Sequence, residues 1–232
     1  MNDVAQERTT QIKICGLKTV TIAKAVGELQ PDFIGFMFAR SKREVTPAEA
    51  GEMIRAMRQT GSSAKVVGVF VNPTLAQLAS VLAEAPLDIV QLHGAETPDY
   101  CEEMKSHFPH IAVWKVLSVT ESDMENGATE LARTIDTYNG AIDAIMLDTQ
   151  GGGTGKTFRW ELIPVVKARA AAAALPLYIA GGLQPDNVGE LVTTYAPDGV
   201  DVSSGVETNG EKDITKIAAF IERVRAVDRQ RT

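Results

Sequence analysis

Short apolar runs alternate with longer amphipathic runs along almost the whole chain, and this regular order constrains the fold more than any other feature. We interpret the apolar runs as strands over residues 12–17, 33–38, 65–71, 89–93, 111–119, 144–149, 177–180 and 199–203. We interpret the amphipathic runs as helices over residues 20–30, 47–59, 75–85, 98–108, 123–138, 160–173, 186–195 and 214–227. Strands that alternate with helices in unbroken order predict a parallel sheet with helices on its faces.

A closed barrel and an open doubly wound sheet both fit this order. Residues 66–71 are almost continuously apolar, which is typical of strands buried on both faces. An open sheet usually carries a Gly-rich dinucleotide loop after its first strand, but here Cys15-Gly16-Leu17-Lys18-Thr19 follows instead. We therefore predict an α/β fold with a single (β/α)8 TIM barrel over residues 11–232, preceded by a flexible tail over residues 1–10.

The composition narrows the class of protein. A chain of 232 residues, 44% of them hydrophobic, can bury one sizeable core. A net charge of −7 argues against nucleic acid as a partner. No apolar stretch approaches the roughly 20 residues of a membrane span, and the polar residues 1–10 do not resemble a signal peptide. We expect a cytoplasmic protein in which the two cysteines are free thiols.

Reactive groups of (β/α)8 barrels lie where the strands end, at the carboxyl-terminal mouth. Cys15 lies near the end of the first predicted strand, where it is either a small buried hydrophobic residue or a reactive thiol. Asp148 lies near the end of the sixth predicted strand, after Ile145-Met146-Leu147. A carboxylate there is costly unless it is paired or functional, although an Asp can also hydrogen-bond the backbone of its own loop.

Other loops at this mouth carry groups suited to binding anions. Arg40, Lys42 and Arg43 follow the second strand, where they are either a solvated charge run or a clamp for a carboxylate or phosphate. His93 follows the fourth strand and is either a proton carrier or a packed, hydrogen-bonded histidine, so we assign it no proton transfer.

Small residues dominate the remaining loops. Gly181 and Gly182 follow the seventh strand, and Ser203-Ser204-Gly205 follows the eighth, which is where barrels often build phosphate sites. Residues 150–157 fail the P-loop pattern at Gln150. A mobile lid that bends at Gly152, Gly153 and Gly155 fits this stretch better.

Taken together, these motifs resemble the phosphoribosylanthranilate isomerase family of tryptophan biosynthesis. The matching segments are KICG at 13–16, GFMF at 35–38, SKR at 41–43, VGVFVN at 67–72, VQLHG at 90–94, LDT at 147–149, GKTFRW at 155–160, AGGL at 180–183 and DVSSGVE at 201–207. Each segment alone is a weak signal, but all of them in this order are specific. The chain departs from the family pattern at Glu44 and in residues 208–211, which lack a common Pro.

The resemblance implies a (β/α)8 barrel with no cofactor and no metal. It implies an Amadori rearrangement of N-(5′-phosphoribosyl)anthranilate to 1-(2-carboxyphenylamino)-1-deoxyribulose 5-phosphate. The implied general base is Cys15, the implied general acid is Asp148, and Arg43 would bind the anthranilate carboxylate. The remaining expected substrate-binding residues are Gln91, His93, Gly181, Gly182, Ser203, Ser204 and Gly205.

Two other functions compete with this interpretation. Another phosphate-binding barrel, such as indole-glycerol-phosphate synthase, the tryptophan synthase α subunit or a pentose-phosphate epimerase, would need a catalytic Lys, a Glu pair or metal ligands. Lys13 and Lys115 are the strand lysines that could serve. A non-catalytic scaffold would give no reason for Cys15 and Asp148 to accompany a phosphate site. The expected partner is a small phosphorylated substrate, and the expected state is a monomer or homodimer.

Overall fold

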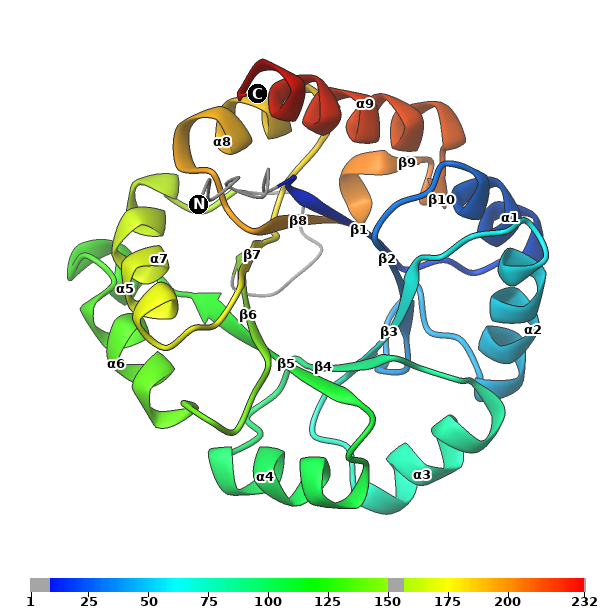
Figure 1. The fold of residues 1–232 in the computed structure, drawn as a ribbon, viewed down its shortest axis with the longest axis horizontal. Helices are drawn as coiled ribbons and strands as arrows, with labels where there is room; N and C mark the ends of the chain where they lie inside the picture. The colour runs from blue at the N-terminus through cyan, green and yellow to red at the C-terminus, as the bar shows by residue number, and fades with distance from the viewer. Residues whose placement is uncertain (1–8, 150–156, 232) are drawn as a thin grey trace, which may run out of the picture.

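The structure is a computed structural model that describes residues 9–149 and 157–231. Eight parallel strands close into a barrel in the order β1 to β8, and helices surround it (Figure 1). The strands are β1 (Gln11–Cys15), β2 (Phe33–Met37), β3 (Lys65–Phe70), β4 (Ile89–Leu92), β5 (Ala112–Val119), β6 (Ala144–Thr149), β7 (Leu177–Ile179) and β8 (Gly199–Val202). The predicted (β/α)8 barrel is therefore confirmed.

The helices follow the predicted order, with one interruption. They are α1 (Val20–Glu28), α2 (Pro47–Arg58), α3 (Leu75–Glu84), α4 (Pro98–His107), α5 (Glu121–Glu125), α6 (Thr129–Thr137), α7 (Ile163–Ala172), α8 (Pro185–Tyr195) and α9 (Ile214–Arg231). The single helix predicted over 123–138 is wrong, because Gly127 and Ala128 have positive φ angles of 64° and 61° and separate α5 from α6. A 3-10 turn, Trp160–Leu162, also precedes α7.

A threonine forms the N-cap of each of the first five α-helices. Thr19, Thr46, Thr74, Thr97 and Thr120 accept a hydrogen bond from the third residue of the helix that follows. Each cap satisfies one of the orphan amide groups of the first turn and stabilises the helix by about 1 kcal/mol. The caps therefore fix where these helices begin after the strand and its loop.

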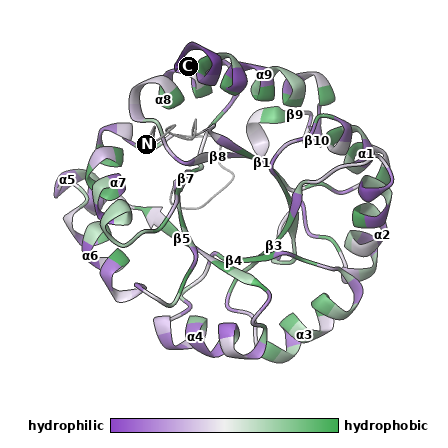
Figure 2. Ribbon diagram, viewed as in Figure 1, coloured by the Kyte–Doolittle hydropathy of each residue, from purple (hydrophilic) through white to green (hydrophobic). Residues whose placement is uncertain are grey.

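Strand alternation divides the apolar side chains into two layers. Ile12, Ile14, Val200 and Val202 point outward into the main core, which lies between the strands and the helices. The other face fills the barrel interior, where Trp114 stacks on Tyr178 with ring centroids 4.3 Å apart. The helices show hydrophilic and hydrophobic segments side by side in Figure 2, as expected for elements with one buried face.

The ends of the described chain are tied together. Thr10 is buried, and its backbone N–H and hydroxyl donate to the Asp228 carboxylate on α9 at 3.0 and 2.8 Å. Thr10 thus belongs to the barrel rather than to the tail expected over residues 1–10, of which residues 1–8 lie outside the described residues. Among the described residues, no helix is long and apolar enough to cross a membrane.

Candidate active site

A pocket of about 350 Å³ opens at the carboxyl ends of the strands. Its lining includes Cys15, Arg43, Gln91, His93, Asp148 and Ser203, all of which the sequence singled out. The two candidate proton-transfer residues come from different strands, Cys15 from β1 and Asp148 from β6. Barrel closure therefore brings together side chains that lie far apart in the chain.

Cys15 lies at the floor of this pocket with only 4% of its surface exposed. Burial raises the pKa of its thiol above the ordinary value, although the charge of Lys13 opposes this effect. Gly16 follows with a φ of +81°, and a Cβ there would lie 2.6 Å from Cδ of Arg43. The Cys-Gly pair therefore lets the Arg43 side chain reach the end of β1.

Asp148 carries the carboxyl group that is the candidate proton donor of the site. Burial first, and then the charge of Asp201, raise its pKa to about 6, so a larger fraction of this carboxyl group is protonated near neutral pH than of an ordinary Asp. Its Oδ1 also accepts a 2.7 Å hydrogen bond from the backbone N–H of Thr149, so the loop-anchoring alternative and the pocket position are both realised. His93 Nε2 lies 3.7 Å from Asp148 Oδ2.

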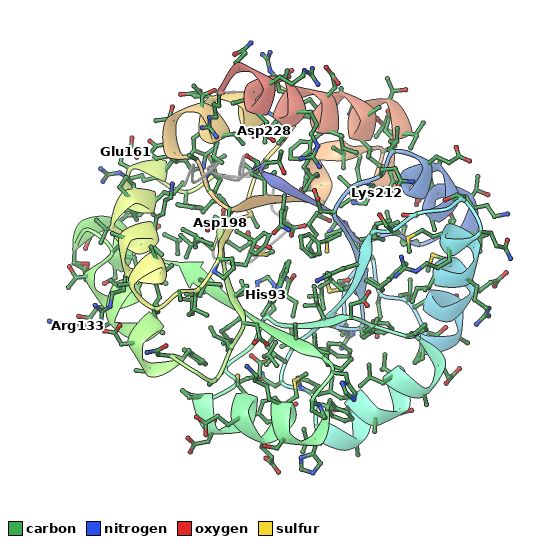
Figure 3. All side chains as sticks on the ribbon, viewed as in Figure 1. His93, Arg133, Glu161, Asp198, Lys212 and Asp228 are labelled. Carbon is green, nitrogen blue, oxygen red and sulfur yellow. The ribbon has the colours of Figure 1, made fainter. Side chains whose placement is uncertain are left out.

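His93 is uncharged at neutral pH, because burial and the neighbouring Lys13 and Lys115 lower its pKa. It lies within the ring of strands in Figure 3, whereas Arg133 and Glu161 lie on the outside. The amide oxygen Oε1 of Gln91 is buried and has no hydrogen-bond partner among the described residues. A buried acceptor without a partner is costly in a folded protein, which makes this atom a candidate for ligand binding.

The orientation of the Arg43 side chain is fixed by Glu207, an acidic partner that the sequence did not predict. Its Nε and Nη2 donate to the two carboxylate oxygens of Glu207 at 2.7 and 2.9 Å. Lys212 also donates to Glu207, at 2.8 Å, and to the carbonyl of Ser203, at 2.8 Å. Lys212 belongs to a small hairpin, β9 (Glu207–Thr208) with β10 (Glu211–Lys212), that follows β8 and is labelled in Figure 1.

The two small-residue loops lie beside each other next to Asp148. Gly181 and Gly182 have positive φ angles of 84° and 66°, and a Cβ on Gly181 would lie 2.9 Å from Asp148 Oδ1. A Cβ on Gly205 would lie 1.8 Å from the carbonyl oxygen of Leu183, so the loops after β7 and β8 are in direct contact. Gly181, Gly182, Ser204 and Gly205 do not line the described pocket, which Ser203 alone of this group reaches.

The remaining predictions concern the strand lysines, Glu44, metal ligands and the lid glycines. Lys13 and Lys115 are both buried in ion pairs, with Asp201 at 3.0 Å and Glu96 at 2.8 Å, so neither presents a free amine to the pocket. Glu44, where the chain departs from the family pattern, forms an isolated backbone bridge to Met37 on β2. No cluster of potential metal ligands occurs among residues 9–149 and 157–231. The predicted lid glycines Gly152, Gly153 and Gly155 lie outside the described residues.

Fold and site together define a (β/α)8-barrel enzyme with a thiol and a protonatable carboxyl group in one pocket. Residues 12–223 match the family model of N-(5'phosphoribosyl)anthranilate (PRA) isomerase. The chain therefore belongs to this family, and it is an isomerase.

Individual relatives agree with this assignment. An N-(5'-phosphoribosyl)anthranilate isomerase of Brevibacillus brevis is 44% identical over 221 residues, covering 94% of each chain. The solved phosphoribosyl anthranilate isomerase of Thermotoga maritima has 32% identity and a TM-score of 0.76, covering 94% of this chain and 100% of that one. A solved isomerase in complex with reduced 1-(o-carboxyphenylamino)-1-deoxyribulose 5-phosphate has 32% identity and a TM-score of 0.74, with the same coverage.

Proposed function

We propose that the chain converts N-(5′-phosphoribosyl)anthranilate into 1-(2-carboxyphenylamino)-1-deoxyribulose 5-phosphate in tryptophan biosynthesis, with Asp148 as general acid and Cys15 as general base. The observation that carries the proposal is that these two residues line one pocket in a member of this isomerase family. The substrate and product are isomers, so the reaction requires only proton transfers and no external oxidant.

Asp148 acts first, on the furanose ring. The C1′–O bond breaks as the anilino nitrogen forms a double bond to C1′, and the departing ring oxygen needs a proton. A carboxylic acid with a pKa of about 6 retains a useful protonated fraction near neutral pH, which an ordinary Asp does not. The buried position of Asp148 at the end of β6 is the cause of this shift.

Cys15 acts second, on the resulting iminium ion. The positive C1′=N group acidifies the hydrogen on C2′, and the Cys15 thiolate removes it. The electron pair of that C–H bond then forms the C1′=C2′ double bond, and the iminium nitrogen becomes an amine. The enol produced tautomerises to the ketone with little help from the protein. General catalysis of this kind contributes roughly 10²–10⁴-fold per group.

The remaining polar groups suit the rest of the substrate. Arg43 binds the anthranilate carboxylate, because a guanidinium is the best-matched donor for that group. The free Oε1 of Gln91 accepts a hydrogen bond from a sugar hydroxyl. Gly181, Gly182, Ser203, Ser204 and Gly205 receive the 5′-phosphate in the two adjoining loops after β7 and β8. We place this enzyme in the cytoplasm, as a monomer or homodimer.

The assay is direct. The purified chain is mixed with freshly made phosphoribosylanthranilate, and loss of the substrate's fluorescence is followed for the wild type and for Cys15→Ala. We expect rapid loss for the wild type and a rate near background for the variant. Absence of turnover by the folded wild-type chain would contradict the proposed reaction.

A further inference from the structure

A buried ion pair lies inside the barrel immediately below the proposed base. Lys13 and Cys15 are two residues apart on β1, so their side chains project from the same face of the strand. The β1–β8 register sets Lys13 opposite Asp201, and Lys13 Nζ lies 3.0 Å from Asp201 Oδ1. Lys13 is fully buried and Asp201 lines the catalytic pocket, so the pair belongs to the floor of the site.

We propose that Lys13, kept charged by Asp201, is a positioning residue that stabilises the Cys15 thiolate, and that this pair controls how protons are distributed between Cys15 and Asp148. The inference deepens the proposed function and rests on it. Neither Lys13 nor Asp201 needs to touch the reacting atoms for this role, because both act through the field they impose on the acid and the base.

The packing around Gly35 on β2 brings Lys13 and the thiol together. A Cβ built on Gly35 would lie 2.8 Å from Cys15 Sγ and 3.2 Å from Lys13 Cε, so both side chains pack against the same bare backbone. The positive charge of Lys13 also acts on the Cys15 thiol and lowers its pKa. An ammonium group in this position is a natural counter-ion for a thiolate.

Lys13 and Asp201 have opposite effects on the pKa values of Cys15 and Asp148. For Cys15, burial raises the pKa most, the charge of Lys13 lowers it, and the charge of Asp201 raises it. For Asp148, burial again raises the pKa most, Asp201 raises it further, and Lys13 lowers it. The charge of Lys13 ranks directly after burial among the influences on Cys15, whereas it is the weakest of those on Asp148, so removing it should affect the thiol more.

Other charged groups surround these residues and bear on the test. Lys212 on β10 lowers the pKa of Cys15, and the Arg43 guanidinium is itself influenced by the thiolate. His93 lies beside Asp148 but is uncharged at neutral pH. These groups are unchanged in variants of the pair, so a shift on changing Lys13 or Asp201 reports the pair itself.

The test measures ionisation of Cys15 without relying on turnover. Absorbance of the thiolate near 240 nm is titrated with pH, and the spectrum of Cys15→Ser at each pH is subtracted to remove tyrosine and Cys101 contributions. In Lys13→Met we expect the midpoint to rise by roughly 1–3 pH units, the usual effect of losing an opposite charge at this range. In Asp201→Asn we expect it to fall, because the thiolate then becomes the main counter-ion of Lys13.

Lys115→Met is the matched control, because it also removes a lysine from a buried ion pair in the barrel wall but leaves the pocket lining intact. Its Cys15 midpoint should equal that of the wild type. A wild-type midpoint in Lys13→Met, or shifts of the same sign in Lys13→Met and Asp201→Asn, would overturn the proposal.

A variant that leaves one buried charge unpaired risks failing to fold, so the double variant Lys13→Met/Asp201→Asn gives an independent route. Compared with Asp201→Asn alone, the double variant should have a higher midpoint, and equal midpoints would overturn the role of Lys13. In turnover, kcat of Lys13→Met should fall while KM changes little. A wild-type chain that titrates as described but does not isomerise phosphoribosylanthranilate would refute the proposed function and leave the electrostatic relationship standing.

Discussion

Glu207 receives two parallel hydrogen bonds from Arg43, from Nε at 2.7 Å and from Nη2 at 2.9 Å. Burial alone would raise the pKa of Glu207, but the hydrogen bonds from Arg43 and Lys212 hold it below its ordinary value, so the carboxylate is charged. One edge of the guanidinium is therefore taken by the protein itself. Glu207 fixes the orientation of Arg43 and leaves its Nη1 group without a partner among the described residues.

We predict that Arg43→Ala raises KM for phosphoribosylanthranilate by roughly 10–100-fold and changes kcat much less. Hydrogen bonds to a charged group are worth about 1.5–3 kcal/mol, and this contact persists from bound substrate to transition state. Arg43→Lys should recover only part of the loss, because an ammonium group cannot form the paired hydrogen bonds to Glu207 and still present a separate donor to the substrate. Steady-state kinetics measure both, and an unchanged KM in the alanine variant would return this loop to an ordinary solvated charge run.

We predict that Cys15→Ser and Asp148→Asn each lower kcat by about 10²–10⁴-fold with a much smaller effect on KM. Both substitutions preserve shape and remove a proton-transfer group that acts in the transition state. Single-turnover fluorescence measurements give the rates, and circular dichroism serves as the folding control. Near wild-type turnover in either variant would make that residue structural, and His93 would be the next residue to test.

We predict that Ser204→Asp strongly weakens substrate binding, because it sets a carboxylate against the substrate phosphate. Gly182→Val should also weaken binding, since a β-branched side chain is strained at a φ of +66°. Unphosphorylated ribosylanthranilate is the matching probe, and both variants should lose much less with it. If the wild type used the phosphorylated and unphosphorylated compounds equally well, the phosphate assignment would be wrong.

The pH dependence of kcat/KM should reflect two groups, Asp148 and Cys15, of which the proposed acid has the lower pKa and the proposed base the higher one. Asp148 has a pKa of about 6, whereas the Cys15 pKa is raised above its ordinary value, so near pH 7 the single proton resides mainly on the thiol. The reactive form, thiolate with carboxylic acid, is a constant minor fraction between the two values. We expect kcat/KM to rise as pH increases through about 6, to remain level, and to fall only at alkaline pH.

The variant Asp148→Asn tests whether Asp148 is the group that limits activity below about pH 6. Without the titrating acid, its residual activity should depend only on the thiolate fraction, and should increase steadily toward alkaline pH with no step near 6. Residual activity that still shows the acidic limb of the wild type would assign that limb to another group.

Local sequence patterns were sufficient for the barrel and for six of the residues that line the pocket. Each strand has its own apolar run, and the candidate residues Cys15 and Asp148 end strands, so position along the chain already implies position at the mouth. The helix predicted over 123–138 was wrong where Asn126-Gly127 interrupts it, a turn signal that the amphipathic pattern around it obscured.

The sequence by itself determined which residues reach the mouth of the barrel, because strand alternation and strand ends are local properties. Only the tertiary structure decided which of them meet. Lys13 pairs with Asp201 across 188 residues, and Arg43 with Glu207 across 164, because barrel closure sets β1 beside β8 and the loop after β8 folds back toward the loop after β2. The pKa of Asp148 likewise depends on burial and on Asp201, both of which arise only when the barrel is closed.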